Sequence, residues 1–157
     1  MIALASGFAP GSDAGLSPAA RFRHDSRFRN VACSASVSAQ DRARTVQEIL
    51  HAAHEAALDN WDEEGAAAVE QTTVRHTVNF VLALPQGVSS PSVLVDRDGD
   101  FAFDWGATAQ RTFSVSVGRD GTLTYAGLYD RARTHGRENF RGSVPAAILA
   151  HIERASR

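Results

Sequence analysis

Residues 92–128 read SVLVDRDGDFAFDWGATAQRTFSVSVGRDGTLTYAGL. Apolar and polar residues alternate through this stretch, and Asp98-Gly99 and Asp120-Gly121 are strong signals for tight hairpin turns. Alternation predicts strands with one buried and one polar face, and short connections predict antiparallel pairing, because parallel strands need long crossovers. We therefore expect a four-stranded antiparallel meander sheet, with strands over 92–95, 101–105, 111–117 and 122–128.

The same alternation assigns one face of the sheet to the core. The residues expected to face the helices are Phe101, Phe103, Trp105, Phe113, Val115, Leu123 and Tyr125. Residues 106–110 read as a loop, and the basic stretch 130–141 reads as irregular.

Helical periodicity flanks the sheet on both sides. Apolar residues at i, i+3 and i+4 spacing predict one helix over about 41–58 and a second over 67–84, which ends before Pro85. A closing helix is predicted over 144–154, with Pro145 in its first turn. The expected fold class is α+β, with two N-terminal helices, the meander and one C-terminal helix.

Length and composition limit the classes of protein that the chain can represent. A length of 157 residues suits one domain, and no apolar run approaches the roughly 20 residues of a membrane-spanning helix. The single cysteine, Cys33, excludes a disulfide framework. All 16 basic residues are arginine, which fits a GC-rich bacterial genome and leaves no lysine for Schiff-base or phosphate chemistry. We expect a cytoplasmic bacterial protein without a cofactor.

Residues 1–40 differ from the rest of the chain. They are rich in Ala, Ser, Gly and Arg, contain Pro10 and Pro18, and show no sustained periodicity. We expect a disordered tail over 1–40 and a single α+β domain over 41–157. The Arg-rich segment 21–29 suggests nucleic-acid binding, and an over-extended gene start is the alternative.

A set of short motifs resembles a widespread, uncharacterised group of small bacterial α+β proteins. These motifs are Trp61-Asp62-Glu63-Glu64-Gly65-Ala66, Leu82-Ala83-Leu84-Pro85, Val93-Leu94-Val95 and Phe103-Asp104-Trp105. The group has a Trp-Asp-Gly-Tyr-Gly-Ala-like box, a helix ending in Leu-Pro and an antiparallel meander. This chain has Glu63 and Glu64 where the group has Gly and Tyr. The resemblance covers about 55–128 and implies the fold and a bacterial, mobile-element setting, with no activity attached.

Two segments are candidate binding sites. The acidic, aromatic junction of Trp61, Asp62, Glu63 and Glu64 suggests a corner that binds a protein partner. Its alternative is a structural anchor, in which Trp61 packs and Asp62 caps the second helix. The basic segment suggests nucleic-acid or phosphate binding through Arg131, Arg133, His135, Arg137 and Arg141, and its alternative is pairing with acids of the body.

No coherent catalytic or metal-binding motif stands out. The spacing of His51, His54 and Glu55 is not the zinc-protease pattern, and the loop from Asp96 lacks the glycine of a calcium loop at its sixth position. We therefore name no catalytic residue and no metal site.

The sequence thus favours a non-enzymatic interaction protein: a regulator, an immunity factor or a defence-related accessory factor that binds a protein partner through its surface. Residues 45–130 hold thirteen acidic residues against four arginines, which suits a basic partner. One alternative is a nucleic-acid-associated protein that uses residues 21–29 and 131–141. Another is a small hydrolase or transferase with an unrecognised site that assembles from distant residues such as His76, Asp104 and His135. The sequence makes no prediction of oligomeric state.

Overall fold

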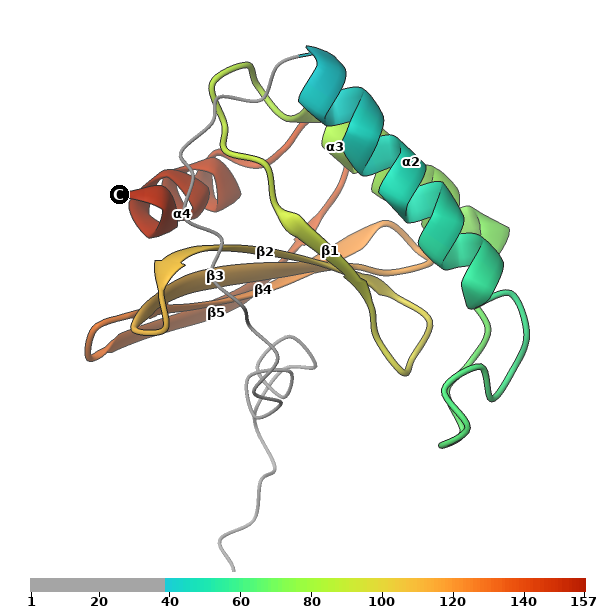
Figure 1. Cartoon of the computed structure of the whole chain (residues 1–157). Helices are drawn as coiled ribbons and strands as arrows, with labels where there is room; N and C mark the ends of the chain where they lie inside the picture. Colours follow the sequence, from blue (N-terminus) through green and yellow to red (C-terminus); the bar gives the residue numbers. More distant parts are fainter. Residues whose placement is uncertain (1–38) are drawn as a thin grey trace, which may run out of the picture.

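The computed structural model describes residues 39–157 (Figure 1). The elements in chain order are α2 (Ala39–Glu55), α3 (Gln71–Ala83), β1 (Ser92–Val95), β2 (Phe101–Thr108), β3 (Arg111–Val117), β4 (Thr122–Tyr129), β5 (Ala132–Asn139) and α4 (Ala146–Ser156). The α+β class and the three helices agree with the sequence-based prediction. The Arg-rich segment 21–29 and all of the predicted tail up to residue 38 lie outside the described residues, whereas Ala39 and Gln40 belong to α2.

The sheet has five strands in the order β1-β2-β3-β4-β5, and every neighbouring pair is antiparallel. The meander is therefore confirmed, but the expectation of four strands is wrong. Residues 132–139, expected to be irregular, form the fifth strand at the edge of the sheet. The second strand also continues to Thr108, through most of the predicted loop.

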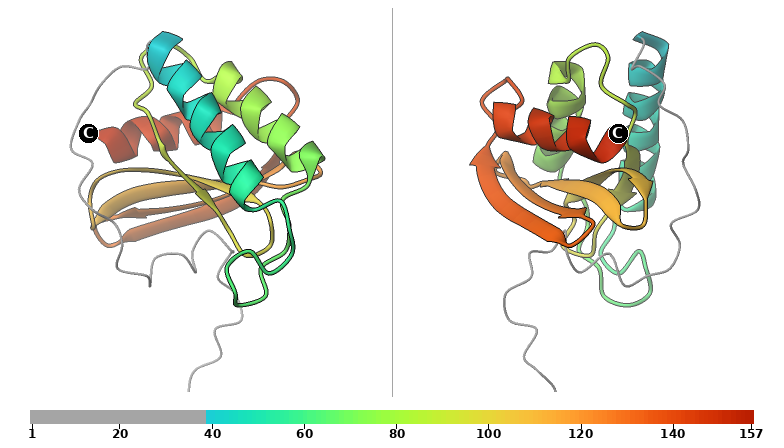
Figure 2. Two further views of the ribbon diagram at one scale, coloured as in Figure 1. Left: turned by 45° about the vertical axis from the view of Figure 1, so that its right-hand side comes forward. Right: turned by 90° about the vertical axis from the view of Figure 1, so that its left-hand side faces the viewer.

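All three helices cover the same face of the sheet, as Figures 1 and 2 show from three sides. This inner face carries the predicted core. Phe101, Phe103, Phe113, Val115 and Leu123 are fully buried, Trp105 is buried, and Tyr125 is half-buried against the same cluster. Phe80 of α3 packs on Phe103 with ring centroids 5.3 Å apart. The register of the sheet therefore puts the predicted face against the helices.

The helix α3 begins four residues later than its apolar pattern predicts. The backbone amides of Ala67, Ala68 and Val69 bond to the carbonyl oxygen of Arg97, the carboxylate of Asp59 and the carbonyl oxygen of Ala56. These amides serve the packing of the loop against α2 and the β1–β2 turn, so the segment stays extended until Gln71.

The helix α4 docks on the sheet through a group of stacked rings. The His151 ring lies nearly parallel to Tyr129 and Phe113, at centroid distances of 5.7 and 5.3 Å. The Tyr129 hydroxyl is 3.0 Å from His151 Nδ1, and the Arg154 guanidinium lies 4.1 Å from the centroid of the Tyr129 ring. Ile148, Ile152 and Ala155 complete the buried side of the helix.

None of the helices within residues 39–157 is long and apolar enough to cross a membrane.

Candidate functional site

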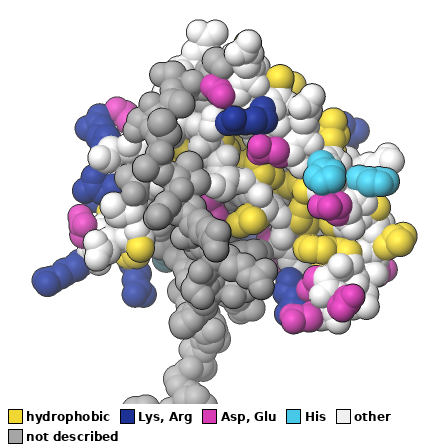
Figure 3. Space-filling model, viewed as in Figure 1, with side chains coloured by type: hydrophobic (Ala, Val, Ile, Leu, Met, Phe, Trp, Pro, Cys, Tyr) yellow, Lys and Arg dark blue, Asp and Glu magenta, His cyan; other side chains and the backbone are white. Residues whose placement is uncertain are grey.

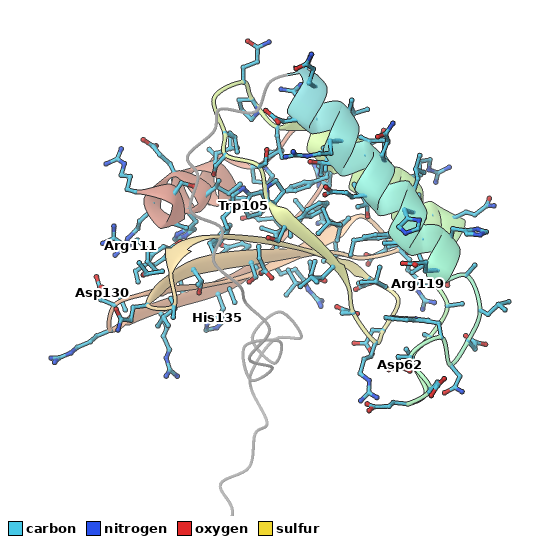
Figure 4. The ribbon with its side chains drawn as sticks, viewed as in Figure 1. Asp62, Trp105, Arg111, Arg119, Asp130 and His135 are labelled. Atoms are coloured by element: carbon cyan, nitrogen blue, oxygen red, sulfur yellow. The ribbon has the colours of Figure 1, made fainter. Side chains whose placement is uncertain are left out.

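The edge strand β5 has two rows of side chains with different chemistry. Its register with β4 pairs Leu128 with Arg133, Ala126 with His135 and Thr124 with Arg137. These partners point away from the helices, so Arg133, His135, Arg137 and Asn139 form the outer row. Figure 4 shows His135 below the sheet and Trp105 on the helix side. The inner row, on the helix side, consists of Ala132, Thr134, Gly136 and Glu138.

The outer row is exposed and basic. Arg133, His135 and Arg137 are all exposed, and Arg131 continues the row into the β4–β5 turn. Within residues 39–157, none of the three arginines lies within 4.0 Å of a carboxylate oxygen, although Arg44, Arg97, Arg111, Arg119 and Arg157 each do. Within the described residues, Arg131 and Arg133 therefore lack the pairing with body acids that the sequence suggested as an alternative, whereas the charge of Arg137 contributes to the lowered pKa of Asp120. Arg141 is exposed beyond the end of β5 and is likewise without such a pair there.

The backbone of β5 is paired on one side only. Its ladder with β4 runs from Ala132 to Asn139, and among the described residues no strand lies on its other side. The helices pack over β1 to β4 and leave β5 without a covering helix. Every second residue of an edge strand points its N–H and C=O groups outward, so β5 offers a row of hydrogen-bonding groups beside a row of basic side chains.

Acidic side chains gather at the end of the sheet that carries the β1–β2 and β3–β4 turns. Figure 3 shows a group of arginines on its left-hand side and a group of acidic side chains at its lower right. The β1–β2 and β3–β4 turns border a polar hollow of about 430 Å³, whose lining includes Asp98, Asp100, Asp120, Arg119 and Arg137. Arg137 thus connects the basic row to this hollow.

Two carboxyl groups in the β1–β2 turn are perturbed by their surroundings. Burial, followed by the charges of Asp96, Asp98 and Asp120, raises the pKa of Asp100 to about 6. Burial also raises the pKa of Asp96, although its carboxylate accepts hydrogen bonds from the amides of Asp98 and Asp100. The hydrogen bond from the Thr122 amide is the main cause of the lowered pKa of Asp120.

No group of three His, Cys, Asp or Glu side chains in residues 39–157 is placed to hold a metal ion.

The corner of Trp61, Asp62, Glu63 and Glu64 is linked to the β1–β2 turn. Arg97 Nε donates to Asp62 Oδ2 at 3.0 Å, and Arg97 Nη2 donates to Glu64 Oε2 at 2.5 Å. The Trp61 indole N–H donates to the Ala67 carbonyl oxygen at 3.1 Å, while Glu63 is exposed. Two of the acids predicted to bind a partner are therefore engaged within the chain.

Asp62 does not cap the second helix, contrary to the alternative that the sequence suggested. Its Oδ1 atom accepts the amides of Glu64 and Ala66, several residues before α3 begins at Gln71. These hydrogen bonds, chiefly the one from the Ala66 amide, lower the pKa of the Asp62 carboxyl group. Glu70, the N-cap residue that precedes α3, makes no capping hydrogen bond with its side chain. Asp62 fixes the loop, because its carboxylate satisfies amides that no strand or helix would pair.

The catalytic combination of His76, Asp104 and His135 is not assembled. His76 lies on α3 against Gly121, on the helix side of the sheet. Asp104 and His135 lie on the outer face in one cross-strand row, with Ser114 and Ala126 between them. Three strand spacings separate β2 from β5, which is about 14 Å. These three residues therefore do not form a common site for a hydrolase or a transferase.

Searches with family models, through curated proteins and through solved structures find no match to this chain. The geometry of the chain itself is consequently the basis for any proposal about function.

Proposed function

We propose that the chain is a non-enzymatic interaction protein that holds an acidic, extended segment of a protein partner along the edge of β5. The observation that supports this most is the outer row of Arg133, His135 and Arg137. These basic side chains are exposed, none lies within 4.0 Å of a carboxylate oxygen in residues 39–157, and the outward backbone groups of their strand have no described neighbour. Addition of a strand to a sheet edge is a common mode of peptide recognition. Backbone hydrogen bonds then supply affinity and the side-chain row supplies selectivity.

A nucleic acid is a poorer fit to this surface. Proteins that bind single strands without sequence preference combine cations with aromatic rings on which bases stack. The outer face of the five strands carries no Phe, Tyr or Trp, since these side chains all lie on the helix side.

Pairing of β5 with a second copy of itself is also disfavoured. A two-fold antiparallel pairing centred on His135 would place Arg133 of one copy opposite Arg137 of the other, twice. Like charges directly opposite each other destabilise a strand pair. Charged side chains of this kind are a known protection of edge strands against self-association. With an acidic segment in place of the second copy, the same arginines would face carboxylates and attract them.

The test is the affinity of the full chain for a defined acidic peptide. The probe is a fluorescein-labelled octapeptide of alternating Thr and Glu, as long as β5, and the readout is fluorescence anisotropy at 0.15 M salt. The double variant Arg133→Gln/Arg137→Gln should bind about 2- to 30-fold more weakly, because each cross-strand charge pair contributes roughly 0.2–1 kcal/mol. No binding of the peptide by the unaltered chain at millimolar concentration would refute the proposal.

The matched control removes two arginines from the helical side of the molecule. Arg44→Gln/Arg75→Gln changes the net charge equally but lies on α2 and α3. At this salt concentration, charges farther than about 8 Å from the ligand are largely screened. The affinity of this control variant for the peptide should therefore stay within about twofold of that of the unaltered chain. An equal loss in both double variants would indicate an unspecific charge effect. Tight, steeply salt-dependent binding of a 20-nucleotide single-stranded DNA would favour the nucleic-acid alternative instead.

A further inference from the structure

The two rows of β5 differ in charge, and this difference bears on the sequence of the partner. The outer row presents Arg133, His135 and Arg137. The inner row presents Ala132, Thr134 and Gly136, followed by Glu138, and contains no cation. Basic residues therefore alternate along the strand with residues that are neutral or acidic.

We infer that the partner segment carries its acidic residues at alternate positions, with uncharged residues between them; this inference rests on the proposed function. In a strand added beside β5, successive side chains point to opposite faces, and residues of one face are about 6.7 Å apart. Acids at alternate positions then lie opposite Arg133, His135 and Arg137. The intervening residues lie beside the inner row.

An acidic residue of the partner segment is disfavoured beside the inner row for two reasons. Glu138 is half-buried at one end, and a carboxylate opposite it would face a like charge. At the middle of the row, Gly136 lies under the ring of Tyr125, so a partner side chain that lies beside Gly136 meets an aromatic surface. Uncharged, β-branched residues suit such positions, because they pack well on a pleated, half-buried surface.

The pattern depends only on the alternation of the strand, so it holds for a segment that runs parallel or antiparallel to β5. A continuous acidic run does not satisfy it. In any register, half of the carboxylates of such a run point to the inner row, where Ala132, Thr134, Gly136 and Glu138 offer no cation.

Two octapeptides of identical composition test this inference against the full chain by fluorescence anisotropy. One alternates Thr and Glu, and its isomer has four Thr followed by four Glu. We expect the blocked isomer to bind at least about threefold more weakly than the alternating one. Equal affinity of both peptides would overturn the inference and leave the proposed function intact, whereas binding of neither peptide would overturn the proposed function.

A variant of the inner row gives an independent readout. Glu138→Gln removes the like charge, so it should improve binding of the blocked isomer while leaving the alternating peptide within about twofold. The thermal unfolding midpoint of this variant, measured alongside, shows that the fold is retained. A Glu138→Gln chain whose preference for the alternating peptide equals that of the unaltered chain would contradict the role given to the inner row.

Discussion

The phenol group of Tyr125 occupies the space above Gly136, its cross-strand partner in β5. A Cβ atom at residue 136 would overlap the Tyr125 hydroxyl and ring. Glycine at this position therefore lets an aromatic ring extend from β4 over the edge strand, which joins β5 to the core cluster on the helix side.

This relationship predicts the effect of adding one methyl group. Gly136→Ala should lower the free energy of unfolding by roughly 1–3 kcal/mol, the usual cost of overpacking, as measured by urea denaturation. In a Tyr125→Ala background the ring is absent, so the same substitution should cost much less. A loss below about 0.5 kcal/mol in the unaltered background would mean that Tyr125 does not lie over Gly136.

A second prediction concerns the register of β2. Phe103 is fully buried, pairs with Val115 across the sheet and contacts Phe80. Phe103→Ala should cost roughly 3–5 kcal/mol, since it leaves a cavity where a ring was packed. Thr124→Ala, on the outer face, is the control and should cost less than about 1 kcal/mol. A small loss at Phe103 would indicate a register shifted by one residue, because such a shift exchanges the two faces.

The carboxyl group of Asp100 should destabilise the fold at neutral pH. Its pKa of about 6 in the folded chain exceeds the ordinary value of 3.8, so the folded state binds a proton more readily than the unfolded state. Asp100→Asn should therefore raise the unfolding midpoint at pH 8, and the gain should shrink as the pH falls from 6 to below 4. Thermal unfolding measured at pH 8 and again below pH 4 checks this change.

Asp120 in the same hollow provides a control of opposite sign. Its pKa is lowered, chiefly by the hydrogen bond from the Thr122 amide, so its charged form stabilises the fold. Asp120→Asn should lower the unfolding midpoint at pH 8. A gain at both positions would mean that the general reduction of acidic charge, and not the burial of Asp100, is the cause.

The stacked ring of His151 predicts a loss of stability in mild acid. Burial, and secondly the charge of Arg154, lower the pKa of His151 below its ordinary 6.5. The folded state therefore takes up a proton less readily than the unfolded state, so stability present above pH 6.5 decreases as the pH falls below it. His151→Phe should keep the stacking and weaken this dependence between pH 6.5 and 5. An unchanged slope of stability against pH in this variant would contradict the prediction.

The strands of the core were predictable because their pattern is strong. β1 and β3 have the predicted bounds, and β2 and β4 begin where the turn signals end. The sequence pattern did not predict the fifth strand, for two physical reasons. Its inner row contains Gly136 and Glu138, so no hydrophobic alternation is visible. Its turn contains Asp130, in the left-handed region at φ 56°, followed by Arg131 in place of the usual glycine.

The candidate site was predictable in part. The basic residues of 131–141 were identified from their composition alone, but composition could not say that they share one face. That arrangement follows from the strand, which alternates Arg133, His135 and Arg137 with small or acidic residues. The links from Arg97 to Asp62 and Glu64 span more than thirty residues, so no local pattern reports them.

Hydrogen exchange measures most directly whether β5 takes up an added strand. The account predicts that saturation with the alternating Thr-Glu octapeptide slows amide exchange at alternate residues between 132 and 139, because their outward N–H groups acquire acceptors. Amides near Trp61 and along α2 should exchange as before. Peptide binding that leaves the exchange of β5 unchanged, or that slows it around Trp61 to Glu64 instead, would contradict the account.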